Sequence, residues 1–493
     1  MIIIKDLTNS DNWSVWHRSL SSPTTKQLYL NSTVAEQNQS TPGQFGRQLP
    51  TDSVFYVDSP TNYSSTNYVA YLFAHDDQRF GENSDEAIIK CGSYTGNGNS
   101  SGQTIDLGFE PQWVLLKKTT GSGEAWIMHD NMRGIVTDDN DPQLQADGSA
   151  AEWSGSTNID LTPTGFKITS SSAQYNEDTR PYIYMAIRRP HKPASEFAAT
   201  DLFHVESAAF TDSIIGNDFP ADIAFYHQSS SDNYKRFTTR LTQGNVLYLD
   251  QTSAEASENY VTFDNNEGAE INYSGSLPNF HWRVFRRAPG FIDVVTYEGN
   301  STQGREVSHN LTTAPEMMWI KDRGVSTDYV IYAEPVGATK FLQFGQSAAI
   351  STDADERFDD TAPTESVFTL GNKDEVNASS RNYLAILFGS VDGISKVGSY
   401  TGTGNDLNVD CGFSSGARFV IIKRTDSTGD WFVWDTARGI VAGNDPYFRI
   451  NEFSGDITNT DYIDPLSSGF TVTSSAPSSI NTSGGTYLFY AIA

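Results

Sequence analysis

The chain repeats itself about every 100 residues, and this repetition restricts its fold more than any other feature. The best-marked element of each repeat is an apolar run that ends in lysine, then a polar turn, then an aromatic residue. It occurs at Lys5, Lys117, Lys321 and Lys423, with aromatic partners Trp13, Trp126, Tyr329 and Trp431 eight or nine residues downstream. A fainter copy runs from Tyr226 to Tyr234, with tyrosine where lysine is expected. Spacing of this size predicts a tandem array of domains rather than a solenoid.

Two other landmarks give the boundaries of the repeats. An aromatic closing segment ends each repeat, at residues 68–71, 182–185, 280–283, 383–386 and 487–490. A Gly-Ser-Tyr-Thr-Gly segment opens the best-kept repeats, at residues 92–96 and 398–402. Together they predict repeats at residues 1–87, 88–190, 191–288, 289–390 and 391–493.

The first repeat, residues 1–87, is predicted to be incomplete because its opening strand is missing. Either the domain is trimmed at its start, or the sequence begins inside a longer coding region. Unpaired strand edges would remain open in both cases, which favours pairing with another chain or with an upstream segment.

The local pattern within each repeat is that of β-strands. Short segments rich in Val, Ile, Thr, Tyr, Phe and Trp are bounded by Gly, Ser, Asn and Asp. Residues 165–169 and 469–473 alternate apolar and polar side chains, which places one face on a core. We therefore expect an all-β chain of about five antiparallel β-sandwich repeats. Prolines in residues 188–193 predict one stiff linker.

Charge and motifs exclude several classes of function. The chain has 33 basic and 61 acidic side chains, so its formal charge is −28. This charge repels nucleic acid and anionic lipid, and no apolar run approaches the roughly 20 residues of a membrane span. The sequence contains no H-E-x-x-H, Gly-x-Ser-x-Gly or phosphate-loop motif, so we predict no enzyme. A polysaccharide depolymerase stays an alternative because it requires only two placed carboxylates.

Exposed aromatic residues are the candidate binding groups. Trp16, Trp434 and Tyr332 are the candidate glycan contacts, because a sugar ring stacks on an aromatic face. The alternative is that these rings are buried between two sheets. The recurring lysines have two interpretations as well: ligands for anionic sugars, or strand-end residues whose stems cover the core while their ammonium groups pair with acidic neighbours.

Acidic loops are the remaining candidates for a site. Arg133 and Arg438 follow Asp130 and Asp435 at a fixed distance, which predicts arginine–aspartate pairs that hold long loops in place. Calcium is the alternative ligand, because two loops are rich in carboxylates. These carboxylates belong to Asp138, Asp139 and Asp141 in one loop and to Asp353, Asp355, Asp359 and Asp360 in the other. Neither loop has the spacing of a known calcium motif, and we predict no cofactor.

The landmarks resemble an uncharacterised repeat domain of structural and tail-fibre-like proteins of tailed phages, especially marine cyanobacterial phages. The residues that carry the resemblance are Gly92–Gly98, Leu107–Lys118, Met132–Gly134, Gly165–Phe166 and Tyr182–Ile187. The last repeat matches nearly as well, through Gly412–Phe413, Ile422–Asp426, Ala437–Gly439 and Gly469–Phe470. Residues 191–288 depart furthest from the pattern.

The resemblance implies a virion surface protein, on a tail fibre or capsid appendage, that other virion proteins hold and that aids attachment to host glycans. It also favours a homotrimer. We expect synthesis in the host cytoplasm without a signal peptide, because no basic lead precedes the apolar start and the two cysteines, Cys91 and Cys411, suit a reducing compartment. A carbohydrate-binding adhesin is the second hypothesis, and the depolymerase is the third.

Overall fold

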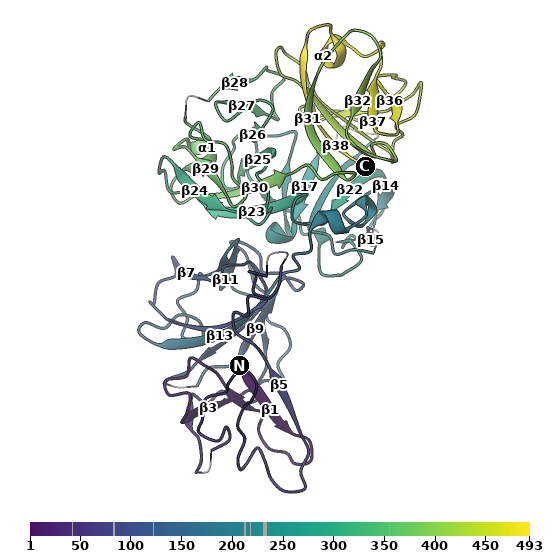
Figure 1. Ribbon diagram of the computed structural model, residues 1–493. Coiled ribbons are helices and arrows are strands. Elements are labelled where there is room, and N and C mark those ends of the chain that lie inside the picture. Colours follow the sequence, from purple (N-terminus) through teal and green to yellow (C-terminus); the bar gives the residue numbers. More distant parts are fainter. Residues whose placement is uncertain are drawn as a thin grey trace. The chain divides into compact units, whose positions relative to one another are not determined.

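The computed structural model describes all residues except 42, 82, 83, 122, 212, 217, 230–233 and 354. The chain divides into two compact units, Met1–Pro190 (unit 1) and His191–Ala493 (unit 2) (Figure 1). The division falls inside the stretch predicted as a linker. We call residues 1–87, 88–190, 191–288, 289–390 and 391–493 repeats 1 to 5, so unit 1 holds repeats 1 and 2 and unit 2 holds repeats 3 to 5.

The elements of unit 1 are almost all strands. Repeat 1 contains β1 (Ile2–Asp6), β2 (Ser14–Trp16), β3 (Lys26–Tyr29), β4 (Gln37–Asn38) and β5 (Tyr68–Leu72). Repeat 2 contains β6 (Ile89–Thr95), β7 (Gln103–Asp106), β8 (Pro111–Lys118), β9 (Ile127–Asp130), β10 (Leu144–Gln145), β11 (Ile159–Thr162), β12 (Gly165–Ile168) and β13 (Pro181–Arg188).

Each repeat of unit 2 runs from an opening strand to a closing strand, and repeat 3 also contains the 3-10 helices Ala194–Glu196, Ala199–Asp201 and Arg240–Thr242. Repeat 3 contains β14 (Phe203–Phe210), β15 (Ser213–Ile215), β16 (Ile223–Gln228), β17 (Arg236–Thr239), β18 (Asn245–Tyr248), β19 (Ala256–Ser257), β20 (Val261–Thr262), β21 (Ala269–Ile271) and β22 (Leu277–Phe285). Repeat 4 contains β23 (Ile292–Glu298), β24 (Arg305–Ser308), β25 (Met317–Asp322), β26 (Val330–Ala333), β27 (Lys340–Gln343), β28 (Ser351–Thr352), β29 (Val367–Leu370), α1 (Asp374–Asn377) and β30 (Asn382–Phe388). Repeat 5 contains β31 (Ser395–Thr401), β32 (Leu407–Asp410), β33 (Phe419–Arg424), β34 (Trp431–Asp435), β35 (Phe448–Arg449), β36 (Ile463–Leu466), β37 (Gly469–Val472), α2 (Ser478–Asn481) and β38 (Thr486–Ile492).

Repeats 2 to 5 are antiparallel β-sandwiches, as predicted. Each has a large sheet in which the closing strand lies between the opening strand and the lysine strand, as in the order β31-β38-β33-β34-β35. A small sheet of two or three strands, such as β32-β37-β36, faces it. In repeat 5, Val409 and Phe470 of the small sheet share one buried cluster with Val420 and Phe489 of the large sheet. The apolar residues of the period-two alternation predicted from the sequence thus line the inner faces of the sandwich.

Repeat 1 is built differently from the others. Its described strands form one sheet, ordered β4-β3-β2-β1-β5, and no described strand pairs with the outer edge of β5. In the other repeats the opening strand occupies that edge, as β6 does beside β13. The prediction that repeat 1 lacks its opening strand agrees with this sheet order.

Helices contribute little to the fold. The two α-helices, α1 and α2, are four residues each, and both precede a closing strand. In the described part of the chain, none of the helices has the length and apolar character that crossing a membrane requires.

Candidate functional site

The recurring lysines join adjacent repeats. Lys117, Lys321 and Lys423 are buried, and each ammonium group donates to main-chain carbonyls on two sides. One carbonyl belongs to the hairpin that follows the lysine, for example Thr327 O at 2.6 Å from Lys321 Nζ. The other belongs to the preceding repeat. Lys321 Nζ lies 3.0 Å from Thr252 O, Lys423 Nζ 3.1 Å from Ser347 O, and Lys117 Nζ 2.8 Å from Thr33 O.

Aromatic and main-chain groups complete each contact. The indole nitrogens of Trp126 and Trp431 donate to Tyr29 O at 2.9 Å and Gln343 O at 2.8 Å in the preceding repeat. A backbone N–H of the preceding repeat also donates to the carbonyl two residues after the lysine. These bonds are Glu36 N to Thr119 O, Glu255 N to Arg323 O, and Ile350 N to Thr425 O, at 2.8 to 3.1 Å. The lysine and backbone hydrogen bonds therefore recur at all three contacts between successive repeats within a unit, and the indole hydrogen bond recurs at two of them.

In repeat 3 the lysine stands at the position where other repeats have the aromatic residue. This corrects the sequence alignment, which placed Tyr226 at the lysine position. The lysine position is the residue opposite the second residue of the closing segment, as Lys321 is opposite Leu384. In repeat 3 that residue is His227, opposite His281, and not Tyr226. A one-residue slip reverses the faces of a strand, so Tyr226 points to the opposite side. The register that pairs Tyr226 with Arg236 brings Lys235 opposite His227, where other repeats have the aromatic residue.

Lys235 closes the three repeats of unit 2 into a ring. Its ammonium group donates to Glu452 O and, at 2.9 Å, to Ser454 O of repeat 5. The matching backbone bond joins Asp456 N to Ser229 O at 3.0 Å. The lysine of repeat 4 thus bonds to repeat 3, the lysine of repeat 5 bonds to repeat 4, and the lysine of repeat 3 bonds to repeat 5.

The centre of this ring is apolar. In Figure 1 the closing strands β22, β30 and β38 lie toward the middle of unit 2. Rings from different repeats meet there: Phe388 and Tyr490 lie 4.9 Å apart between centroids, and Phe285 and Phe419 lie 6.3 Å apart. A small cavity at this junction is lined by Ile223, Phe225, Phe237, Phe285, Ile292, Trp319, Phe388, Phe419 and Tyr490. All nine side chains of the lining are aliphatic or aromatic, so the junction functions as a shared core.

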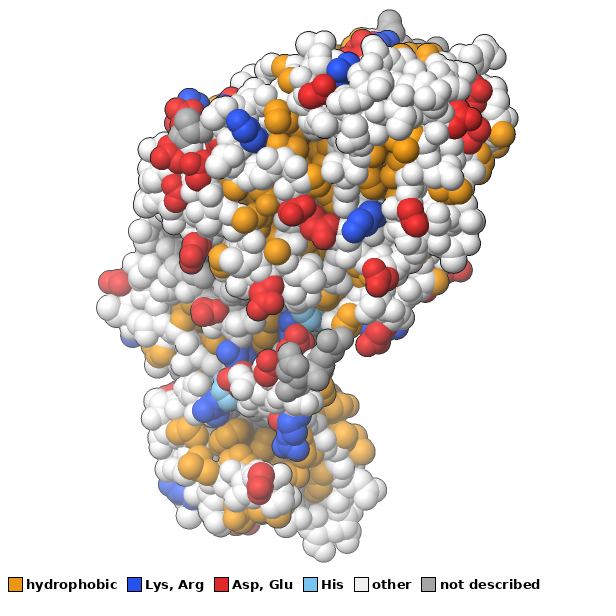
Figure 2. All heavy atoms as spheres, turned by 45° about the horizontal axis from the view of Figure 1, so that its top comes forward, with side chains coloured by type: hydrophobic (Ala, Val, Ile, Leu, Met, Phe, Trp, Pro, Cys, Tyr) orange, Lys and Arg blue, Asp and Glu red, His pale blue; other side chains and the backbone are white. Residues whose placement is uncertain are grey.

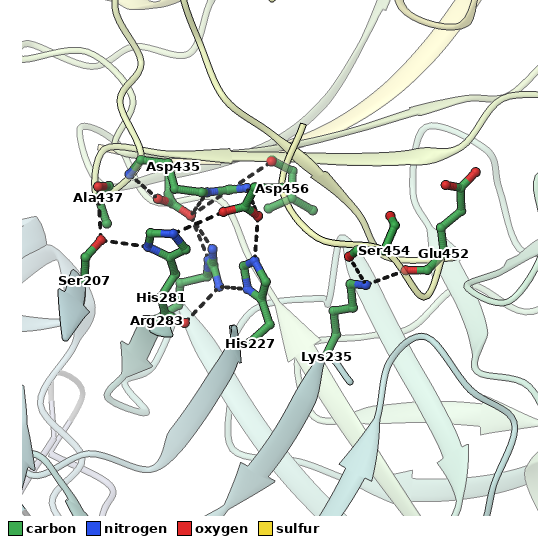
Figure 3. A network of polar contacts seen from close by, with 12 residues as sticks. Ser207, His227, Lys235, His281, Arg283, Asp435, Ala437, Glu452, Ser454 and Asp456 are labelled. Carbon is green, nitrogen blue, oxygen red and sulfur yellow. Dashed lines mark hydrogen bonds and ion pairs between the residues drawn. The ribbon is translucent and has the colours of Figure 1, made fainter. Parts of the chain in front are cut away.

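A buried charge network lies where repeat 3 meets repeat 5 (Figure 3). Arg283 of repeat 3 donates from Nε to Asp435 Oδ2 at 2.9 Å, and Arg438 Nη2 donates to the same oxygen at 2.8 Å. Asp456 lies 2.8 Å from His227 Nε2 and 3.1 Å from Nε2 of a second histidine, His281. Arg438 Nη1 also lies 3.4 Å from Asp456 Oδ1, so Asp435 has two and Asp456 three cationic or imidazole partners, as a buried charge requires.

Burial and the charges themselves set the ionisation of this network. Burial, partly opposed by the hydrogen bond to Asp456, lowers the pKa of His227 to about 3, so its ring is neutral at pH 7. Arg283 and Arg438 hold the pKa of Asp435 well below its usual range despite its burial. Burial lowers the pKa of Arg283 to about 10, which leaves the guanidinium charged. The sequence predicted only the Asp435–Arg438 pair of this network, because the other members come from separate strands of two repeats.

The proposed glycan contacts are in the interior, which corrects that expectation. Trp16, Trp434 and Tyr332 are 7%, 0% and 2% exposed. A sugar ring cannot stack on a face without access to solvent, so the structure favours the alternative that these rings pack between the sheets. The large aromatic side chains that are exposed lie elsewhere, and include Tyr71, Trp153 and Tyr260.

The arginine–aspartate pairs occur as expected. Arg133 forms an ion pair with Asp130, as Arg438 does with Asp435. Asp141, in one of the proposed calcium loops, is buried and accepts N–H groups from Asn158 and Ile159 at 2.7 and 3.0 Å. Within the described ranges, no group of three or more His, Cys, Asp or Glu side chains is placed to hold a metal ion. The prediction of no cofactor stays a prediction, with calcium as its alternative.

The comparisons with known proteins identify a family. Residues 1–190 and 285–493 match the family model described as Domain of unknown function (DUF7483). The chain belongs to this family. No curated protein matches it, and no solved structure matches it. The two matched stretches of this DUF7483 chain contain repeats 1, 2, 4 and 5, whereas most of repeat 3, with the His227 and Lys235 exchange, lies outside them.

Proposed function

We propose that the chain is a structural protein of a phage virion, part of a tail fibre or surface appendage, whose repeats also serve adhesion to the host surface. The observation that carries this proposal is the recurrence of one set of hydrogen bonds at every contact between successive repeats within a unit. The recurring lysine and aromatic side chains are used to join repeats. Residues used in this way support a building element more than a catalyst.

The charge of the chain suits such a role. Acidic side chains are scattered over the face seen in Figure 2 rather than gathered in one patch. With a formal charge of −28, the surface repels nucleic acid, so an appendage would stay soluble and apart from the packaged genome.

Adhesion to glycans is supported by one aromatic cluster in repeat 3. Tyr260, which is 40% exposed, lies 5.6 Å from Tyr273 between ring centroids, with an interplanar angle of 82°. The buried ring of Phe210 contacts both, with centroids 5.9 Å from Tyr260 and 5.2 Å from Tyr273. Aromatic rings fixed by packing and open on one side provide a contact area with little loss of entropy on binding.

The experiment is binding of the purified chain to a panel of bacterial surface polysaccharides, with release of reducing ends measured in the same samples. We expect binding without release, and loss of at least tenfold in affinity for Tyr260→Ala. Trp153→Ala, another exposed aromatic residue, is the matched control and should bind as the unaltered chain does. Release of reducing ends would instead indicate a depolymerase, and no binding to any glycan would leave a structural role without adhesion.

The structural role has its own measurement. Light scattering gives the mass of the purified chain in solution, and a fibre protein is expected to assemble beyond one chain. A mass of one chain over a wide concentration range would count against a self-assembling fibre.

A further inference from the structure

Each contact between repeats has two halves, and unit 1 contains one half of each kind that is not used. The donor half consists of the lysine, the aromatic residue opposite it and the carbonyl two residues after the lysine. The acceptor half consists of carbonyls and one N–H group at and just after the end of the strand that pairs with the aromatic strand. In repeat 4 this strand is β27. In unit 2 all three donor halves and all three acceptor halves are engaged.

Repeat 1 presents an open donor half. Lys5 Nζ donates to Asn9 O and Asp11 O of its own hairpin, at 3.3 and 2.6 Å, which is the same intra-repeat interaction as in the other repeats. No carbonyl of another described repeat contacts it. Leu7, whose carbonyl is two residues after the lysine, is 64% exposed, whereas the equivalent Thr119 is 3% exposed.

Repeat 2 presents an open acceptor half. The strand register places Gln145 opposite Ile127, as Gln343 is opposite Val330. The carbonyls that would accept are therefore those of Gln145 and Ser149, and the N–H that would donate is that of Glu152. All three of these residues are exposed.

The apolar surface between these two halves is also partly uncovered. Phe73, Trp113 and Met128 pack against the core shared by repeats 1 and 2, and each is only partly buried. Their counterparts in repeat 4 of unit 2 are covered: Met317, which corresponds to Trp113, is 1% exposed, and Phe388, which corresponds to Phe73, is 2% exposed. Unit 1 is thus two-thirds of the ring found in unit 2.

We propose that unit 1 binds a third repeat of the same family, carried by a separate polypeptide, which closes it into a three-membered ring. The incoming repeat would place its buried lysine on the carbonyl of Ser149, as Lys423 lies on Ser347 O, and its tryptophan indole on the carbonyl of Gln145, as Trp431 lies on Gln343 O. Its own loop would supply the carbonyls for Lys5. The new contacts would continue an interface that the protein already uses, since the four contacts formed within the two units share one geometry.

A second copy of this chain does not fit both open halves of unit 1. Its unit 1 would add two repeats, and a ring built with the geometry of unit 2 closes with three. Its unit 2 has no free half to offer, because each of its repeats is held on both sides. A single further repeat fits both open halves.

The test mixes the full chain with a separately produced repeat 5, residues 391–493, whose buried cluster is formed wholly by its own residues. Sedimentation velocity and calorimetry are expected to show a one-to-one complex. Lys5→Met and Glu152→Pro should each lower the affinity at least tenfold, because they remove the donor ammonium and the acceptor-half N–H group. Lys26→Met, which removes a lysine of the same repeat outside the donor half, should not.

Three results would overturn the proposal. The first is no complex at concentrations of about 100 μM, where even a weak specific contact is populated. The second is a complex that both variants form equally well. The third is a dimer of the full chain alone that Lys5→Met dissociates, which would make a second copy the occupant.

A second measurement covers the case that repeat 5 alone does not fold. A copy of residues 391–493 joined through a flexible linker to Met1 should slow hydrogen exchange at the Glu152 amide and reduce solvent quenching of Trp13. The same joined chain carrying Lys5→Met should show neither change. Unchanged exchange at Glu152 in the joined chain would refute the proposed ring.

Discussion

A lysine inside a β-sandwich must find an acceptor for its ammonium hydrogens, because an unpaired buried charge is costly. Lys117, Lys321 and Lys423 find theirs among main-chain carbonyls rather than carboxylates. Burial lowers the pKa of each to about 8, so all three still carry charge at neutral pH. Each ammonium also lies 5.8 Å from the centroid of its aromatic partner, a distance at which the ring face contributes attraction.

The exchange of residues in repeat 3 predicts a compensating double variant. His227→Lys alone would put two ammonium groups side by side, and Lys235→Trp alone would remove the cation that bonds to repeat 5. We expect each to lower the free energy of unfolding of unit 2 by about 2–4 kcal/mol. The double variant restores the lysine–tryptophan pair of repeats 2 and 5 and should recover at least about 1 kcal/mol. Denaturant unfolding measures the coupling; strictly additive losses would contradict it.

The neutral state of His227 predicts that unit 2 loses stability in acid. Its pKa falls from 6.5 to about 3 in the folded protein, mainly through burial, so between these values the unfolded chain binds a proton that the folded chain does not. Stability therefore falls as the pH falls, by about 2 kcal/mol from pH 7 to pH 5 for this group.

The measurement is the difference in unfolding free energy between the unaltered chain and His227→Gln at both pH values. A difference is needed because Asp445, whose pKa burial raises to about 7, has the opposite pH dependence. Glutamine has no proton to gain, so the variant should lose about 2 kcal/mol less on acidification. An equal loss in both chains would show that His227 does not titrate as stated.

At this scale the sequence predicted which residues recur but not what they contact. Lys117 and Trp126 stand out by spacing alone, and their roles depend on Thr33 and Tyr29 of another repeat. A main-chain carbonyl acceptor cannot be recognised from the residue type, because every residue has one. The misplacement of the repeat 3 lysine position at Tyr226 has a similar cause: both candidate residues lie in one apolar strand, and only the pairing with His281 distinguishes them.

At the scale of elements, hairpins and loops bring repeats together. The hairpin after β8 approaches the loop after β3 so closely that a Cβ on Gly123 would lie 2.0 Å from Thr33 O. Glycine is needed there because two backbones are in contact. Apolar and polar alternation predicted the strands, whereas such close approaches depend on neighbouring repeats and could not be read from one segment.

Gly123→Ala is expected to loosen the contact between repeats 1 and 2. The added methyl group forces the hairpin away from Thr33, at a cost of about 1–3 kcal/mol in the stability of unit 1. Thermal unfolding followed by tryptophan fluorescence measures it, since Trp126 spans the contact. Gly324→Ala is the control, because its added Cβ would come no nearer than 3.7 Å to any atom. Equal effects of the two changes would contradict the role of Gly123.

At the scale of the whole molecule, the two units differ in how many of their contacts are closed. Unit 2 has three contacts in a ring, and unit 1 has one contact and two open halves. The sequence predicted five repeats. It did not predict that two of them form unit 1 and three form unit 2, because this division depends on which donor half contacts which acceptor half.

We therefore expect two thermal transitions, with unit 1 unfolding first. Scanning calorimetry should resolve them, and limited proteolysis at a temperature between them should leave a fragment that begins near His191. Lys235→Ala should lower the second transition and leave the first unchanged, since only unit 2 contains that lysine. A single transition for the whole chain would contradict independent units.

The closure of unit 2 also dictates an order of events during synthesis. The contact between Lys235 and the loop at Ser454 spans 219 residues, so it forms only after the last repeat has left the ribosome. The two earlier contacts can form as soon as repeats 4 and 5 fold, because they join neighbours. A nascent chain that stalls before residue 435 would keep His227 and Arg283 of repeat 3 without their carboxylate partners Asp456 and Asp435, so we expect chaperones or proteases to act on such unfinished chains.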